Sequence, residues 1–201
     1  MDLYKTIKLP SEGIFKDKGS RFIAFTFPFE IESEIKSFIE PLRKEHFKAV
    51  HFCYAYRIGL DLNSFRVNDD GEPSGSAGRP ILNVLLSKGI TNILVVVVRY
   101  WGGTLLGVPG LINAYKSATE EALTNAEIIE KTVNDIYQIT FGYVQMNDIM
   151  KIIKDFNLKI KNQQFDNQCI IEIEFRQNIS SQVIERLNKI DEIEVFFLYT
   201  V

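Results

Sequence analysis

The sequence predicts an α+β protein with two domains, a mixed α/β domain over residues 1–125 and a smaller domain over residues 126–201. Its 201 residues exceed the needs of one average domain, since domains cluster at about 100–150 residues. The apolar fraction of 46% and the charged fraction of 24% are those of a globular chain, which excludes disordered and fibrous classes. The apolar periodicity also changes repeatedly between that of strands and that of helices.

The first domain is expected to begin with strands around one amphipathic helix. Short runs rich in β-branched and aromatic residues predict strands at 4–9, 14–16, 21–27, 49–58 and 64–68. Apolar residues at helical spacing from Ile31 to Leu42 predict a helix, and Pro41 is expected to shorten or kink it.

The remainder of this domain is expected to alternate helix, strand and helix. Residues 81–87 are predicted to be helical, with Pro80 at the first position and Gly89 at the end. Residues 93–98 are apolar without alternation, which predicts a strand buried on both faces. A long helix is expected to begin near Pro109, with Tyr115 in its apolar stripe.

The second domain has a regular order of elements. Its patterns predict strands at 133–143, 158–165, 169–176 and 194–200, and helices at 148–156 and 183–187. The order is strand, helix, strand, strand, helix, strand. That order is typical of the ferredoxin-like fold, in which two helices cover an antiparallel sheet.

Charge and cysteine content exclude several classes of function. Residues 1–125 carry 15 Lys and Arg against 14 Asp and Glu, a net charge of +1, and residues 126–201 carry 8 against 12, a net charge of −4. Neither domain has the basic excess typical of nucleic-acid-binding proteins, so contact with nucleic acid would need a local patch. Two cysteines and two histidines do not form a recognisable zinc site, and no metal or cofactor is expected.

Two further absences bear on localisation. The longest strongly apolar run, residues 93–98, is far shorter than the about 20 residues of a membrane-spanning helix. The first residues carry no apolar signal segment. We therefore expect a cytoplasmic protein.

The first candidate site is the stretch 69–80, which we call the first glycine loop. Its candidate binding residues are Asp69, Asp70, Glu72, Ser74, Gly75, Ser76, Gly78 and Arg79. Free backbone N–H groups at the start of the following helix, with Ser hydroxyls and a guanidinium beside them, could hold an anion. One alternative is a structural turn whose carboxylates face water, and another is a Mg²⁺ site made by the three carboxylates.

The second candidate site, residues 99–110, is called the second glycine loop. Its candidate residues are Arg99, Tyr100, Trp101, Gly102, Gly103 and Gly110. A buried strand ends there and a helix begins, which is where ligands collect in α/β folds. The alternative is that the glycines permit tight packing and that Arg99 pairs with Asp69 or Asp70. We expect the two loops to meet and form one receptor for negative charge.

No catalytic signature is recognisable in the chain. Ser76 has glycine two residues after it but serine, not glycine, two residues before it, so it does not fit the nucleophile-elbow pattern. No Gly-Lys-Ser/Thr follows the glycines of either loop, as a phosphate-binding loop requires. His51 lies on an apolar strand, where a histidine is typically structural. No catalytic residue is assigned, which favours a binding protein over an enzyme.

The two loops carry a family resemblance. Residues 69–82 and 95–103 closely resemble the signature of the IMPACT family and of its bacterial YigZ-type members. Weaker upstream motifs of the family are matched by supporting residues Arg21, His51, Tyr54 and Arg57. The resemblance implies a first domain with the fold of a small-subunit ribosomal protein and of galactokinase-type (GHMP) kinases. It implies a ferredoxin-like second domain similar to the last domain of elongation factor G.

The resemblance also implies a role, because eukaryotic relatives regulate translation. It favours a translation-associated regulatory binding protein that contacts RNA, the ribosome or a ribosome-bound partner through the two loops. Two alternatives stay open: an enzyme or relic enzyme that binds a phosphorylated or nucleotide ligand with Mg²⁺, and a protein-interaction module. Residues 104–110 depart from the pattern, since many members have there a lysine and a glycine that this chain lacks.

Overall fold

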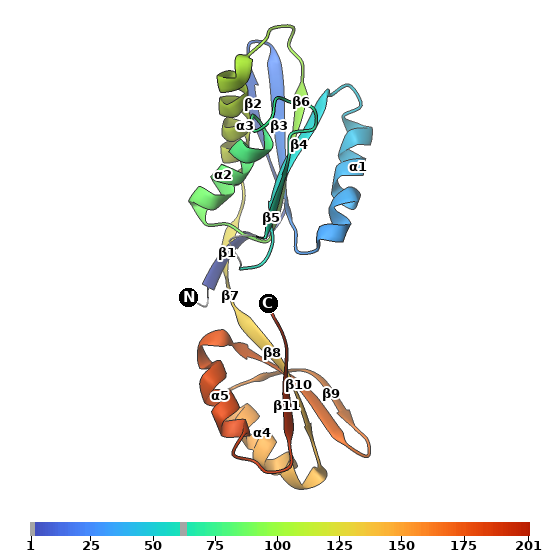
Figure 1. The fold of residues 1–201 in the computed structure, drawn as a ribbon, viewed down its shortest axis with the longest axis vertical. Helices are drawn as coiled ribbons and strands as arrows, with labels where there is room; N and C mark the ends of the chain where they lie inside the picture. Colours follow the sequence, from blue (N-terminus) through green and yellow to red (C-terminus); the bar gives the residue numbers. More distant parts are fainter. Residues whose placement is uncertain (1–2, 61–63) are drawn as a thin grey trace. The chain divides into compact units, whose positions relative to one another are not determined.

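The computed structural model describes residues 3–60 and 64–201 of the chain (Figure 1). It divides into an N-terminal unit, Tyr4–Lys131, and a C-terminal unit, Thr132–Val201 together with Leu3. Helices and strands mix in both units, so the predicted α+β class is confirmed. None of the helices within residues 3–60 and 64–201 is both long and apolar enough to cross a lipid bilayer.

An antiparallel five-stranded sheet forms the centre of the N-terminal unit, in the order β2-β3-β6-β4-β5. Its strands are β2 (Ser11–Asp17), β3 (Ser20–Pro28), β4 (His51–Arg57), β5 (Phe65–Asn68) and β6 (Ile93–Tyr100). The middle strand β6 is buried except at Tyr100. The unbroken apolar run over 93–98 suits that position, because a strand covered on both faces has no side chain that meets water.

Helices cover both faces of this sheet (Figure 1). One face carries α1, and the opposite face carries α2 and α3. The helices are α1 (Ile35–Glu45), preceded by the 3-10 helix η1 (Glu32–Glu34), α2 (Gly78–Lys88) and α3 (Gly107–Thr124). A separate two-stranded sheet pairs β1 (Leu3–Ile7) with β7 (Ile128–Thr132), a strand that no sequence pattern predicted.

Alternation along β6 decides which side chains reach the candidate site. Val96 and Val98 pack in the core beneath α1, and Val95 and Val97 pack in the core beneath α2 and α3. Because side chains of a strand point alternately to the two faces, Arg99 continues the second set. Its guanidinium is therefore delivered to the α2–α3 side of the sheet, where the first glycine loop lies.

Two helix boundaries differ from the sequence-based expectation. α1 continues past Pro41 to Glu45, so the expectation that Pro41 shortens it is wrong. Pro41 is exposed, and the carbonyl group that loses its helical partner there can be hydrated. α2 begins at Gly78, so Pro80 is the third helical residue. A backbone N–H at that position has no intrahelical acceptor, so the absence of an N–H in proline removes no hydrogen bond of the helix. Gly89 ends α2 as predicted, at a φ of 65° that favours glycine.

The C-terminal unit has the predicted order of strands and helices. An antiparallel sheet in the order β11-β8-β10-β9 packs one face against two helices, with isoleucines forming much of the core between them. The elements are β8 (Asn134–Phe141), η2 (Tyr143–Gln145), α4 (Met146–Asp155), β9 (Lys159–Phe165), β10 (Cys169–Arg176), η3 (Gln177–Ile179), α5 (Ser180–Leu187) and β11 (Glu194–Thr200). The strand-helix-strand-strand-helix-strand pattern is the ferredoxin-like one.

The edge strand β2 approaches the backbone of α3 very closely. At Gly13, a Cβ atom would stand 2.1 Å from the backbone nitrogen of Ala122. The hydroxyl of Ser11 donates a hydrogen bond of 2.8 Å to the carbonyl oxygen of the same Ala122. A glycine within a strand pattern is therefore required here by close backbone approach.

Replacing Gly13 by alanine is expected to lower the free energy of unfolding of the N-terminal unit by about 1–3 kcal/mol, because strand or helix must shift to admit the methyl group. Urea titration followed by the fluorescence of Trp101, the single tryptophan, measures this. Glu12→Ala at the exposed neighbouring position is the control and should have a small effect. Equal losses in both variants would contradict the packing explanation.

Candidate functional site

The two glycine loops open at the same end of the five-stranded sheet, which we call the loop end. It comprises residues 17–20, 46–50, 69–77 and 101–106. Hydrogen bonds tie these segments together: Gly102 N–H donates to Ser20 Oγ at 3.2 Å, and Val50 N–H donates to the Arg99 carbonyl oxygen at 2.9 Å. Gly102 has to be glycine, because a Cβ atom there would stand 2.0 Å from the carbonyl carbon of Gly19.

Glu72 joins the two loops through a buried ion pair. Its Oε1 accepts hydrogen bonds from Arg99 Nη1 at 2.6 Å and from the Tyr115 hydroxyl on α3 at 2.7 Å. His51 Nε2 lies 4.0 Å from the same oxygen. Glu72 and Arg99 are only 8% and 4% exposed. Arg99 thus pairs with Glu72, and the alternative pairing with Asp69 or Asp70 is wrong.

The surroundings of this ion pair are apolar enough to keep other groups neutral. The Cys53 thiol lies 3.0 Å from the Asp69 carbonyl oxygen and 3.2 Å from the Tyr115 hydroxyl. Burial raises the pKa of the Cys53 thiol and the pKa of the Tyr115 hydroxyl far above their ordinary values. The hydroxyl therefore stays protonated and serves as a donor to Glu72.

Asp69 occupies the backbone amides that the sequence assigned to an external anion. Its Oδ2 accepts from Gly75 N–H at 2.9 Å, and its Oδ1 accepts from Ala77 and Gly78 N–H at 3.1 and 2.8 Å. A carboxylate at this place stabilises the positive end of α2. The hydroxyl of Ser76 is also used, since it donates to the carbonyl oxygen of Pro73 at 2.6 Å. The expectation of a free amide receptor is corrected: the chain fills it with its own carboxylate.

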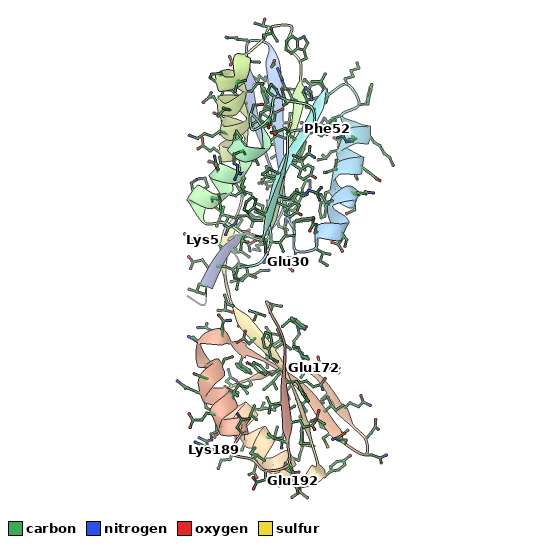
Figure 2. All side chains as sticks on the ribbon, in the orientation of Figure 1. Lys5, Glu30, Phe52, Glu172, Lys189 and Glu192 are labelled. Carbon is green, nitrogen blue, oxygen red and sulfur yellow. The ribbon has the colours of Figure 1, made fainter. Side chains whose placement is uncertain are left out.

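Asp70 has a third set of partners. The Arg43 guanidinium donates to both of its carboxylate oxygens at 2.9 Å, and Phe52 N–H donates to Oδ2 at 2.7 Å. Phe52 lies on β4 on the side toward α1 (Figure 2). The three carboxylates of the first loop therefore point in three directions. They do not converge on one point as the Mg²⁺ alternative requires, and no group of three His, Cys, Asp or Glu side chains suited to a metal ion occurs among the residues described.

Aromatic and cationic side chains stack around the second glycine loop. The Arg21 guanidinium lies 4.4 Å from the ring centre of Tyr100, whose hydroxyl is 2.9 Å from His46 Nδ1. The Arg99 guanidinium lies 5.4 Å from the Trp101 ring centre. Trp101 is 47% exposed, so one part of the indole contacts Arg99 and the rest faces solvent.

Several predicted site residues lie elsewhere or have structural roles. Arg57 is at the opposite end of β4, where it donates to the Ile90 carbonyl oxygen at 2.9 Å. Tyr54 packs beneath α1. Gly110 lies within α3, where a Cβ atom would be 2.9 Å from Leu106. Three residues are exposed without a hydrogen bond among the described side chains, namely Ser74, Arg79 and Gly103.

Two residues of the site were not predicted. The sequence pattern places Tyr115 only in the apolar stripe of α3, although a buried tyrosine needs a partner for its hydroxyl and is identifiable on that ground. Arg43 lies on the exposed face of α1, and no local pattern connects it with Asp70, 27 residues later. The role of Tyr115 could have been inferred from the chemistry of its side chain, whereas the position of Arg43 depends on the packing of α1 against the sheet.

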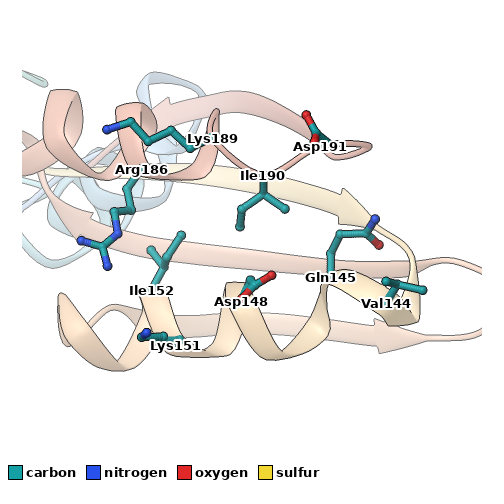
Figure 3. A pocket seen from close by; sticks show the side chains of 9 residues that line it. All are labelled: Val144, Gln145, Asp148, Lys151, Ile152, Arg186, Lys189, Ile190 and Asp191. Atoms are coloured by element: carbon teal, nitrogen blue, oxygen red, sulfur yellow. The ribbon is translucent and has the colours of Figure 1, made fainter.

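The C-terminal unit has a groove of its own, of about 430 Å³, between α4 and α5. Lys151 and Ile152 on α4 face Arg186 on α5 across it (Figure 3). Arg186 and Lys189 are each near a carboxylate, Asp155 at 3.5 Å and Glu185 at 2.8 Å. These mixed, locally paired charges do not indicate a ligand class.

Replacing Glu72 by glutamine is expected to lower the free energy of unfolding by about 3–5 kcal/mol, because Arg99 would be left as a buried charge without a counter-ion. Replacing both Glu72 by glutamine and Arg99 by methionine should recover part of that loss. Urea titration followed by far-UV circular dichroism measures both variants.

The control is Glu127→Gln, which breaks the exposed pair with Lys8 and should cost at most about 1 kcal/mol. If Glu72→Gln and Glu127→Gln lowered the free energy of unfolding by the same amount, the buried ion pair would stabilise the fold no more than the exposed pair does.

Comparison with known proteins shows the family and the overall fold of the chain. Residues 18–123, more than half of the chain, match the Impact N-terminal domain, and both glycine loops lie within that match. One solved structure, described as the crystal structure of an hypothetical protein, aligns over 99% of this chain and 98% of its own with a TM-score of 0.75 and 28% identity.

Curated relatives have similar sequences. IMPACT family member YvyE of Bacillus subtilis (strain 168) is 34% identical over 177 residues, 88% of this chain and 76% of that protein. IMPACT family member YigZ of Escherichia coli (strain K12) is 35% identical over 158 residues, 78% of each chain. Human Protein IMPACT is 35% identical over 96 residues, which are 45% of this chain and 29% of that protein. The chain belongs to the IMPACT family.

Proposed function

We propose that this chain is a translation-associated regulatory binding protein that contacts RNA, on the ribosome, through the loop end of its N-terminal unit. The observation that carries the proposal is the charge of this end. Exposed cationic side chains gather around it, while each carboxylate of the first glycine loop already accepts hydrogen bonds from the chain itself. The local basic patch that the overall composition could not reveal is therefore present here.

Five exposed cations belong to the segments at and next to the loop end: Lys16, Lys18, Arg21, Lys44 and Lys48. Lys16 and Arg21 lie opposite each other in the β2–β3 hairpin. None of the five forms an ion pair with another described side chain. The carboxylates of the same segments are Asp17, Glu45, Asp69, Asp70 and Glu72. Asp70 and Glu72 are paired with Arg43 and Arg99, so cations without an ion pair exceed carboxylates without one. Such an excess on one surface attracts a phosphate backbone.

Exposed aromatic rings lie beside these cations. Trp101 and Phe47 are 47% and 76% exposed. Lys48 Nζ lies 5.6 Å from the ring centre of Phe47. Single-stranded nucleic acids bind surfaces on which bases stack on aromatic rings and phosphates meet cations. The loop end offers both kinds of group, which supports RNA in preference to a small phosphorylated ligand.

Family membership supports the regulatory part of the proposal. The resemblance to proteins that regulate translation concerns the two glycine loops, and both open at the loop end. We infer a contact made by side chains, since the loop amides are already occupied by Asp69. Such a role requires the protein to be in the cytoplasm, with the ribosomes.

Titration with a single-stranded oligoribonucleotide is expected to quench the fluorescence of Trp101, the single tryptophan. Lys18→Glu and Arg21→Glu should weaken binding and lower the slope of log affinity against log salt by about 1 for each phosphate that the variant no longer neutralises. Lys36→Glu, an equal charge change at the start of α1, should leave the affinity and its salt dependence unchanged. Unchanged Trp101 fluorescence at low salt, with saturating RNA, would contradict the proposal.

Sedimentation through sucrose tests the ribosomal part separately. We expect the wild-type protein to sediment with ribosomes at low salt and to be released at high salt. Recovery of all the protein in the top fractions at low salt would show that the ribosome is not its target, even if the oligonucleotide binds.

A further inference from the structure

We propose that the groove between α2 and α3 binds a short, acidic, amphipathic helix of a partner protein. Apart from Gly75 at its margin, its residues lie outside the loop end that is proposed to contact RNA. It therefore adds a protein contact to the proposed function and can fail or hold independently of it.

The shape of the groove suits a short helix. It measures about 530 Å³ and is lined along two helical turns by residues spaced four apart. The lining residues are Arg79, Asn83 and Ser87 on α2 and Ile112, Lys116 and Glu120 on α3. Gly75 lies at its margin, where a Cβ atom would meet open space. A trough that exposes matching faces of two helices is the geometry of helix-in-groove recognition.

The floor of the groove is apolar. Pro80 and Val84 line it from α2 and are buried. Ile112 on α3 is 39% exposed, so an apolar side chain placed over it would remove surface from water. Apolar anchors at helical spacing on the partner would contact these three residues.

The charges of the groove favour an acidic partner. Arg79 is exposed and forms no ion pair with any other described residue, and its guanidinium lies 5.8 Å from the ring centre of Phe65. Lys116 Nζ lies 3.8 Å from Glu120, an exposed pair within one helix that contributes little. Two cations against one carboxylate therefore line the groove, and Glu120 disfavours acidic side chains only near itself.

The same features argue against nucleic acid at this site. The residues that line the groove include no aromatic ring on which a base could stack. Two cations are also fewer than a phosphate backbone typically engages. An acidic peptide needs only one or two ion pairs beside its apolar contacts.

An array of helical peptides of about 14 residues tests the proposal. Each carries leucines at helical spacing, and the remaining positions vary among Glu, Ala and Lys. We expect acidic members to bind the full-length wild-type protein, measured by fluorescence anisotropy. Arg79→Glu and Lys116→Glu should each lower the affinity for the acidic peptides about tenfold. The Lys-rich peptides should bind these two variants more tightly than they bind the wild type.

Lys88→Glu, the same charge change on α2 outside the groove, is the matched control and should leave acidic peptides bound as in wild type. The RNA-dependent quenching of Trp101 should be the same in all four proteins, which separates this inference from the proposed function. The inference is overturned if no acidic peptide binds at millimolar concentration, or if Arg79→Glu and Lys116→Glu bind the peptides as wild type does. Circular dichroism checks that the variants are folded.

Discussion

The carboxylate of Glu72 receives hydrogen bonds from two separate elements, Arg99 at the end of β6 and Tyr115 on α3. Transfer of a carboxylate and a guanidinium out of water is costly, and only close pairing with further donors offsets that cost. The arrangement therefore specifies how the first glycine loop, the central strand and α3 meet. Loss of Glu72 or of Arg99 would leave the other as a buried charge without a counter-ion, so the loop end depends on both.

Internal use of acidic groups shapes the surface of the N-terminal unit. Asp69 is bound to the start of α2, Asp70 to Arg43, and Glu72 to Arg99. A loop that looks acidic in sequence thus presents few uncompensated carboxylates to a ligand. The exposed cations Lys16, Lys18, Arg21, Lys44 and Lys48 are then the main charges at and next to the loop end. A net charge near zero for the region is compatible with a basic surface, because Glu72 is paired inside the fold and Asp70 is paired with Arg43 at the surface.

Much of the fold was predictable because its patterns are local. The apolar run of β6, the glycine that ends α2, and the strand-helix order of the C-terminal unit each follow from residues close in sequence. β7 was missed because its Ile-Ile-Glu-Lys-Thr sequence is short and mostly exposed, so it has no clear apolar face. The expectation that Pro41 shortens its helix was wrong because water can hydrogen-bond the carbonyl group left unpaired at an exposed helix position.

The candidate site was predictable in its residues but not in their pairing. Three carboxylates within four positions have almost the same reach, so spacing cannot decide which one turns inward. The backbone decides: Asp70 and Gly71 adopt positive φ values of 41° and 89°, and the chain reverses there. Such a turn sends Glu72 toward Arg99 and leaves Asp69 with the helix amides. Partners that come from distant elements, such as Arg43, follow only from tertiary packing.

The central claim is that the first glycine loop is satisfied by its own carboxylates and is not a receptor for anions. Titration of the ¹⁵N-labelled protein with inorganic phosphate, followed by the amide signals of Gly75, Ala77 and Gly78, tests it most directly. We expect these three signals to stay in place at phosphate concentrations that shift the amide signals of Lys18 and Lys48. Saturable movement of the three amides, with phosphate replacing Asp69, would contradict the account.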